Sequence, residues 1–193
     1  MINSKFLVQL KKEYRAQESE RRQIGSAANN ILFQAKKTIF ALQRQEFSLG
    51  QEKLEEIAKN LKDLEKKFGS KRLNQEGTYK AAVEEYLEAY TFNRVINGKK
   101  IDKVTGLNLN HASYLGGICD LIGELVRYAT NQAAKGKFEA VAKIKTEAED
   151  IMSGLLDFDM TAYLRTKYDQ ARGHLRKLEQ MAYDIKIRSL EKR

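Results

Sequence analysis

The chain contains no proline among its 193 residues, so no residue in it lacks the backbone N–H that an uninterrupted helix needs. It has only 12 glycines, and a many-stranded sandwich or barrel would need more glycine or proline for its turns. Apolar residues instead recur at helical spacing in one segment after another. The sequence therefore predicts an all-α protein, an elongated single-domain bundle of about six to seven long helices that spans residues 1–193.

The helical periodicity also predicts where the helices begin and end. Residues 3–46 contain one glycine, Gly25, and are expected to form a single very long helix that can bend there. Ser48–Gly50 is expected to separate this helix from the next. Further helices are predicted at Gln51–Phe68, Gly77–Asn97, His111–Ala134, Phe138–Leu156 and Thr161–Leu190. Lys99–Asn110 lacks periodicity and is predicted to be the longest loop.

The charge balance indicates a class of partner. Lysine and arginine outnumber aspartate and glutamate by 35 to 26, a net charge of +9, which favours a polyanion such as nucleic acid. The alternative is that these charges only solvate helix faces. The single cysteine argues against a disulfide framework. The first residues lack the apolar core of a signal peptide, and no stretch is apolar enough to span a membrane. A cytoplasmic protein without a membrane partner is therefore expected.

A narrow polar stripe crosses the most apolar of the predicted helices, His111–Ala134. Its only charged residues are Asp120, Glu124 and Arg127, spaced i, i+4 and i+7, so that they share one face. Burying carboxylates is costly unless they are paired or bind a metal ion. One interpretation is a buried ion pair between carboxylate and Arg127 that fixes the helix register, and the other is a metal site.

The preceding helix supplies two more carboxylates with suitable spacing. Glu85 and Glu88, at i and i+3, are expected to be partly buried. If the two helices pack side by side, Glu85, Glu88, Asp120 and Glu124 converge, and four negative charges in one cleft require a cation. Oxygen ligands favour Mg²⁺ or Mn²⁺ over zinc. The two histidines of the chain belong to no zinc or di-iron motif.

Four stretches of the sequence resemble the translin and translin-associated factor X family. The most specific pattern, GxxDLxGELxR, runs from Gly117 to Arg127. The similarity extends over nearly the whole chain and is carried by residues 35–40 (AKKTIF), 84–92 (EEYLEAYTF), 114–127 (YLGGICDLIGELVR) and 181–188 (MAYDIKIR).

The resemblance implies a fold, an assembly and an activity. It implies about seven helices per subunit and a hollow, octamer-like shell that encloses single-stranded RNA or DNA. In the family the factor X type carries the acidic cluster and cleaves RNA with Mg²⁺, and the matching acids here are Glu85, Glu88, Asp120 and Glu124. Compared with the factor X type, the chain lacks a basic N-terminal extension and has a shorter loop after Asn97. These departures suggest a prokaryote-like member that assembles with itself, with a translin-type partner subunit as the alternative.

The leading functional hypothesis is a Mg²⁺-dependent endoribonuclease acting on single-stranded RNA inside a homo-oligomer. The four acids are expected to serve as both catalytic and metal-binding residues. Arg21, Arg22 and Lys37 are the expected contacts to the nucleic-acid backbone. The first alternative is a non-catalytic oligomer that binds single-stranded nucleic acid, and the second is a purely structural helical oligomer. Helices this long carry more apolar surface than one small bundle covers, which favours an oligomer.

Overall fold

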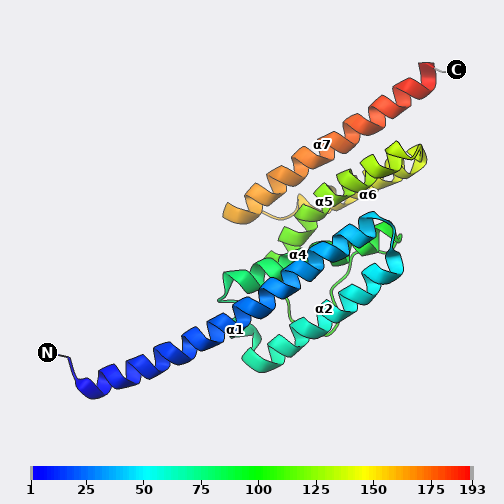
Figure 1. The fold of residues 1–193 in the computed structure, drawn as a ribbon. Coiled ribbons are helices and arrows are strands. Elements are labelled where there is room, and N and C mark those ends of the chain that lie inside the picture. The colour runs from blue at the N-terminus through cyan, green and yellow to red at the C-terminus, as the bar shows by residue number, and fades with distance from the viewer. Residues whose placement is uncertain (1, 192–193) are drawn as a thin grey trace.

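A computed structural model describes residues 2–191, and within them the chain forms seven helices and no strand (Figure 1). The all-α class predicted from the sequence is confirmed, since 83% of the described residues are helical. The helices are α1 (Ser4–Gln43), α2 (Phe47–Phe68), α3 (Ser70–Leu73), α4 (Gly77–Ile96), α5 (His111–Ala134), α6 (Phe138–Leu155) and α7 (Ala162–Glu191).

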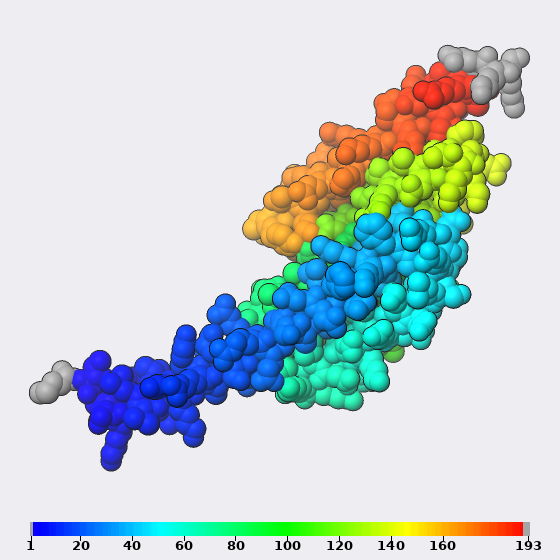
Figure 2. Space-filling model, in the orientation of Figure 1, coloured from blue at the N-terminus to red at the C-terminus, as the bar shows by residue number. Residues whose placement is uncertain are grey.

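The long first helix is continuous through Gly25, and its N-terminal half extends beyond the rest of the molecule (Figures 1 and 2). The Asn3 side chain caps it by accepting a hydrogen bond from the backbone N–H of Lys5 at 2.9 Å. Residues 4–17, here called the α1 arm, are all exposed, and the buried stripe begins only at Ile24. Several large apolar residues of the arm contact solvent: Phe6, Leu7, Val8, Leu10 and Tyr14.

The break after α1 lies earlier than the sequence predicted. Gln45 adopts a positive φ of 67° and turns the chain, and α2 begins at Phe47. Gly50, predicted to lie in the break, is buried inside α2. A Cβ at Gly50 would lie 2.4 Å from a methyl carbon of Leu42, so glycine is needed for close packing between α1 and α2 rather than for a turn.

The loop that follows α4 was predicted from the sequence, but the short helix that precedes α4 was not. The short helix α3 was not predicted, since four residues carry no periodicity of their own. The loop between α4 and α5 is present as predicted, and it covers the core with Val104, Leu107 and Leu109. The backbone N–H of Val104 donates a hydrogen bond to Tyr114 Oη at 2.8 Å, which fixes the loop to α5.

The helices pack in two groups that meet where α4 contacts α5. Helix α1 packs between α2 and α4, and α5 packs against α4, α6 and α7. One cluster of buried side chains fills the first group and a second fills the group of α5, α6 and α7. This central position explains the apolar circumference of α5. Among the described residues, no helix combines the length and hydrophobicity needed to cross a bilayer.

Candidate functional site

Helices α4 and α5 approach closely at a pair of glycines, and this contact sets the geometry of the candidate site. A Cβ at Gly117 would lie 2.9 Å from the backbone oxygen of Glu84 and 3.0 Å from the backbone nitrogen of Glu88. Backbone atoms cannot move aside as a flexible side chain can, so only glycine permits this distance. The spacing brings the acidic face of α4 against the polar stripe of α5.

The four predicted acids lie along this contact and interact electrostatically. Glu85 and Glu88 come from α4, Asp120 and Glu124 from α5, and all four are partly buried. Burial raises the pKa of Glu88 to about 9, and the charges of Glu85, Asp120 and Glu124 add to the effect. Glu88 therefore holds its proton at neutral pH unless a cation is supplied.

The pKa values of Glu85 and Asp120 are also raised, by less than that of Glu88. Burial raises the pKa of Glu85, although the nearby ammonium of Lys36 opposes the increase. Burial also raises the pKa of Asp120, and a hydrogen bond from Lys167 partly offsets it. Burial is thus the main cause of all three shifts, and the neighbouring cations only partly oppose it in Glu85 and Asp120.

Lys167 of α7 is the principal internal cation of the site. Its Nζ lies 2.6 Å from Glu84 Oε1 and also donates a short hydrogen bond to Asp120. Burial alone would lower the pKa of Lys167, but the bonds to Asp120 and Glu84 outweigh it and raise the pKa. The Tyr163 hydroxyl donates to the same Glu84 oxygen at 2.6 Å. Lys167 therefore links α7 to both α4 and α5.

Glu124 is held from the side of α1. Gln43 Nε2 donates hydrogen bonds to Glu124 Oε2 at 2.7 Å and to its backbone oxygen at 2.9 Å. Asn131 Nδ2 donates to Gln43 Oε1 at 3.2 Å. Arg127 Nη1 lies 3.5 Å from Glu124 Oε2, so the ion pair considered from the sequence is present, though it sits at the edge of the cluster with Arg127 exposed.

The donor set can be compared with what a divalent cation requires. Four carboxylates on two adjacent helices are the hard oxygen ligands that Mg²⁺ and Mn²⁺ prefer, and their surplus negative charge is suited to a cation. In residues 2–191, however, no three Asp, Glu, His or Cys side chains are grouped closely enough to hold a metal ion as they stand. The set fits in chemistry and charge, and cation binding requires the side chains to converge.

The three basic residues expected to contact nucleic acid all lie exposed on α1, but in different surroundings. Arg21 pairs with Glu18 at 3.3 Å and approaches Glu76 at 3.9 Å. The Nζ of Lys37 lies 4.4 Å from the ring centroid of Phe33, further along the helix towards the acids. Lys37 and Arg22 therefore present charge to solvent, and Arg21 is partly neutralised.

Sequence reasoning missed several side chains that the structure places in the site. Glu84 stands four residues before Glu88, so the i, i+4 spacing could have placed it on the same face. Lys167 and Tyr163 belong to α7 and reach the acids only through tertiary packing, for which the sequence holds no local signal. Cys119 is a core residue that is 1% exposed, and this burial raises the pKa of its thiol to about 11.

Comparisons with known proteins agree with this fold. The translin of Gallus gallus is 33% identical over 99 residues, covering 50% of this chain and 43% of that protein. The translin of Homo sapiens is 31% identical over the same share of each chain. The matched stretch thus spans less than half the length of these curated relatives.

Solved structures extend the similarity to the whole fold. The crystal structure of apo-NeC3PO has a TM-score of 0.80 at 24% identity and covers 95% of this chain and 97% of that one. The structure of AfC3PO in complex with duplex RNA has a TM-score of 0.84 at 21% identity and covers 95% and 98%. The profile of the Translin family matches residues 19–189. The chain therefore belongs to the Translin family.

Proposed function

We propose that this protein is a Mg²⁺-dependent endoribonuclease of the factor X type that cleaves single-stranded RNA inside a homo-oligomer. The observation that carries the proposal is the acidic cluster of Glu85, Glu88, Asp120 and Glu124. Its charges act on one another strongly enough, together with burial, to raise the pKa of Glu88 to about 9. A structural ion-pair network would pair each carboxylate with a cation, whereas among residues 2–191 only Asp120 and Glu124 of these four acids form an ion pair.

The role of each acid follows from its position. Glu85, Glu88, Asp120 and Glu124 would hold the cation, which when bound supplies Lewis-acid stabilisation of the phosphate and activates water. Gln43 orients Glu124 through two hydrogen bonds. Lys167 bridges Asp120 and Glu84 and so holds the Asp120 carboxylate in place.

The oligomeric part of the proposal is supported by the α1 arm. A run of exposed apolar side chains on an isolated helix is covered in solution by another surface, and a second copy of the chain is the simplest source of one. Octamer-like closure, with or without a translin-type partner, would enclose the RNA. The similar fold of AfC3PO, whose structure contains duplex RNA, supports nucleic acid as the ligand class.

One alternative has an observation of its own. Lys167 already pairs with both Asp120 and Glu84, and the curated relatives reported above are translins. These facts favour a non-catalytic oligomer that binds single-stranded nucleic acid and uses the acids to hold α4, α5 and α7 together. The two functions make different predictions for isosteric variants of the acids.

The test is a cleavage assay with end-labelled single-stranded RNA, with Mg²⁺ and then with excess EDTA. Glu88→Gln and Asp120→Asn remove ligand charge without creating a cavity, and Glu179→Gln, an exposed carboxylate on α7, is the matched control. We expect the wild type and Glu179→Gln to cleave with Mg²⁺ only, and both site variants to lose cleavage while still binding RNA.

Two results would overturn the proposal. If Glu88→Gln and Asp120→Asn cleave as fast as the control, the acids are not the catalytic centre and any activity comes from elsewhere. If no variant cleaves single-stranded or duplex RNA with Mg²⁺ or Mn²⁺ although all bind it, the non-catalytic function is correct.

A further inference from the structure

Beside the acidic cluster, α1 carries a strip of exposed aromatic and cationic side chains. The α1 strip is defined here as Phe33, Lys36, Lys37 and Phe40, together with Arg127 of α5. Phe33 and Phe40 are 53% and 57% exposed, unusually open for phenylalanine. The four α1 residues follow i, i+3, i+4 and i+7, so they share one face of the helix.

Each aromatic ring of the strip is paired with a cation. Lys37 Nζ lies 4.4 Å from the centroid of the Phe33 ring. The guanidinium carbon of Arg127 lies 4.5 Å from the centroid of the Phe40 ring. These distances are those of cation–π contacts, which hold a positive charge beside the ring. The combination of flat apolar rings and positive charge matches nucleic acid, whose bases stack and whose phosphates are anionic.

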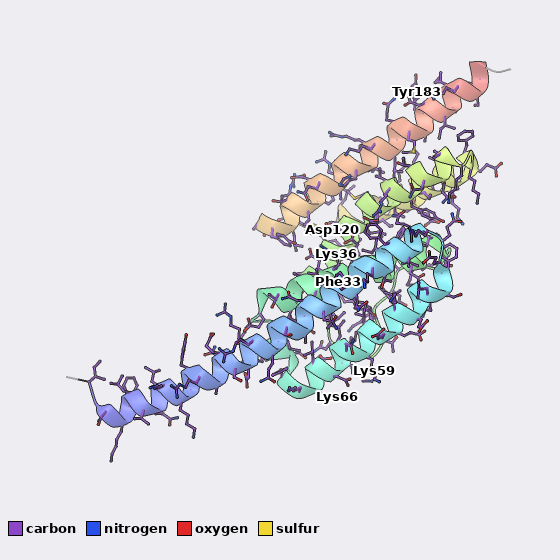
Figure 3. All side chains as sticks on the ribbon, viewed as in Figure 1. Phe33, Lys36, Lys59, Lys66, Asp120 and Tyr183 are labelled. Atoms are coloured by element: carbon purple, nitrogen blue, oxygen red, sulfur yellow. The ribbon has the colours of Figure 1, made fainter. Side chains whose placement is uncertain are left out.

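The strip is continuous with the acids. Arg127, which covers Phe40, also pairs with Glu124 at 3.5 Å. Lys36 lies close enough to Glu85 to lower its pKa against the effect of burial. Figure 3 labels Phe33 and Lys36 on α1, and Figure 2 shows this part of α1 uncovered on the near face. A strand lying on the strip would therefore reach the carboxylates.

We propose that the α1 strip is the base-stacking platform of this site, on which Phe33 and Phe40 stack bases of single-stranded RNA while Lys36, Lys37 and Arg127 contact its phosphates. The two rings are two helical turns apart, about 10 Å along the axis, so they engage separate nucleotides. Stacking on a ring depends little on base identity, so the strip gives affinity and position without strong sequence preference. This inference rests on the proposed function, because it names how that site holds its substrate.

The test measures binding in EDTA, where cleavage cannot occur, by fluorescence anisotropy of a labelled single-stranded RNA. Phe33→Ala and Phe40→Ala are compared with Phe138→Ala, a phenylalanine of α6 that is equally exposed at 52%. Each strip variant is expected to raise Kd at least about fivefold, and the control to leave it unchanged. An RNA of the same length with abasic positions should bind the wild type and Phe33→Ala equally.

Salt dependence separates the cations from the rings. Lys36→Gln is expected to reduce the slope of log Kd against log salt by about 0.7, whereas Phe33→Ala leaves the slope unchanged. Lys59→Gln, an exposed lysine of α2 labelled in Figure 3, is the charge-matched control. Unchanged affinity in both phenylalanine variants would overturn the platform, even if the cleavage assay succeeds.

The mass of each variant by light scattering completes the experiment. If Phe33→Ala and Phe40→Ala lower the mass of the oligomer, and abasic and normal RNA bind the wild type equally, the strip is a contact between copies and the inference is wrong. If mass is preserved and affinity falls for normal RNA alone, the strip binds bases. If the strip variants weaken RNA binding as expected but the wild type does not cleave RNA with Mg²⁺, only the catalytic proposal is refuted.

Discussion

Replacing Glu88 with glutamine should stabilise the metal-free protein, and increasingly so as the pH rises. Burial and three neighbouring acids raise the pKa of Glu88 from 4.5 to about 9. Between these values the folded protein keeps a proton that the unfolded chain releases, so the free energy of unfolding falls as the pH rises. Glutamine has the same shape and no proton to hold, so it removes this contribution.

The size of the effect follows from proton linkage. One proton retained only by the folded state lowers the free energy of unfolding by about 1.4 kcal/mol per pH unit. From pH 6 to pH 8 this amounts to roughly 2–3 kcal/mol for Glu88. The raised pKa of Glu85 acts with the same sign in both proteins, so the difference between wild type and Glu88→Gln isolates the one residue.

Urea denaturation in EDTA at fixed protein concentration, repeated between about pH 6 and pH 8, measures this difference. The stability advantage of Glu88→Gln should grow with pH, while Glu179→Gln should follow the wild type throughout. A stability difference that stays constant across this range would refute the reasoning, because it would mean that Glu88 ionises in the folded protein as it does in the unfolded chain.

Three further predictions concern packing and assembly. Lys167→Met should lower the free energy of unfolding by roughly 1–3 kcal/mol, since it leaves Glu84 and Asp120 without their cation. Its control, Arg165→Met, breaks an exposed pair with Asp169 and should lower the free energy of unfolding by less than about 1 kcal/mol. Equal losses of stability in urea titrations of the two variants would contradict the bridging role of Lys167. Gly117→Ala should lower the free energy of unfolding by about 1–3 kcal/mol, because the added methyl group pushes α4 away from α5. Its control is Gly154→Ala in α6, where a methyl group has open space, and this change should leave stability unchanged or raise it in the same assay. Light scattering should give a mass several times 22.2 kDa that falls when Leu7 and Leu10 of the α1 arm are changed to Asp; a wild-type mass of a single chain would contradict the assembly.

Much of the fold could be predicted because each long helix carries its own apolar periodicity. The bounds of α4, α5, α6 and α7 differ from prediction by at most one residue. The start of α2 was wrong because Gly50 and its neighbours look like a turn, while the real break depends on the backbone of Gln45. A glycine needed for close packing and a glycine needed for a turn look the same in a sequence.

The sequence indicated which acids belong to the candidate site, but it did not indicate the side chains from other helices that pair with them. Glu85, Glu88, Asp120 and Glu124 lie on two helices that follow each other in the chain, so helical spacing sufficed to place them along one helix contact. The close convergence expected of them is not present among residues 2–191, where no three acids are grouped closely enough to hold a metal ion. Lys167 and Gln43 reach the same acids from α7 and α1, and only the packed structure brings them there. In the metal-free protein Asp120 and Glu124 are therefore not free carboxylates, because Lys167 and Gln43 already bind them.

The central claim, that the carboxylates of α4 and α5 bind a divalent cation, is tested most directly by isothermal titration of the metal-free protein with Mn²⁺ at neutral pH. The account predicts saturable binding in the wild type with release of protons from the cluster, because the proton of Glu88 must leave before its carboxylate can bind a cation. It also predicts that Glu88→Gln and Asp120→Asn weaken binding at least tenfold while Glu179→Gln does not. Equal Mn²⁺ affinity in all four proteins, or no binding by the wild type at millimolar Mn²⁺, would contradict it.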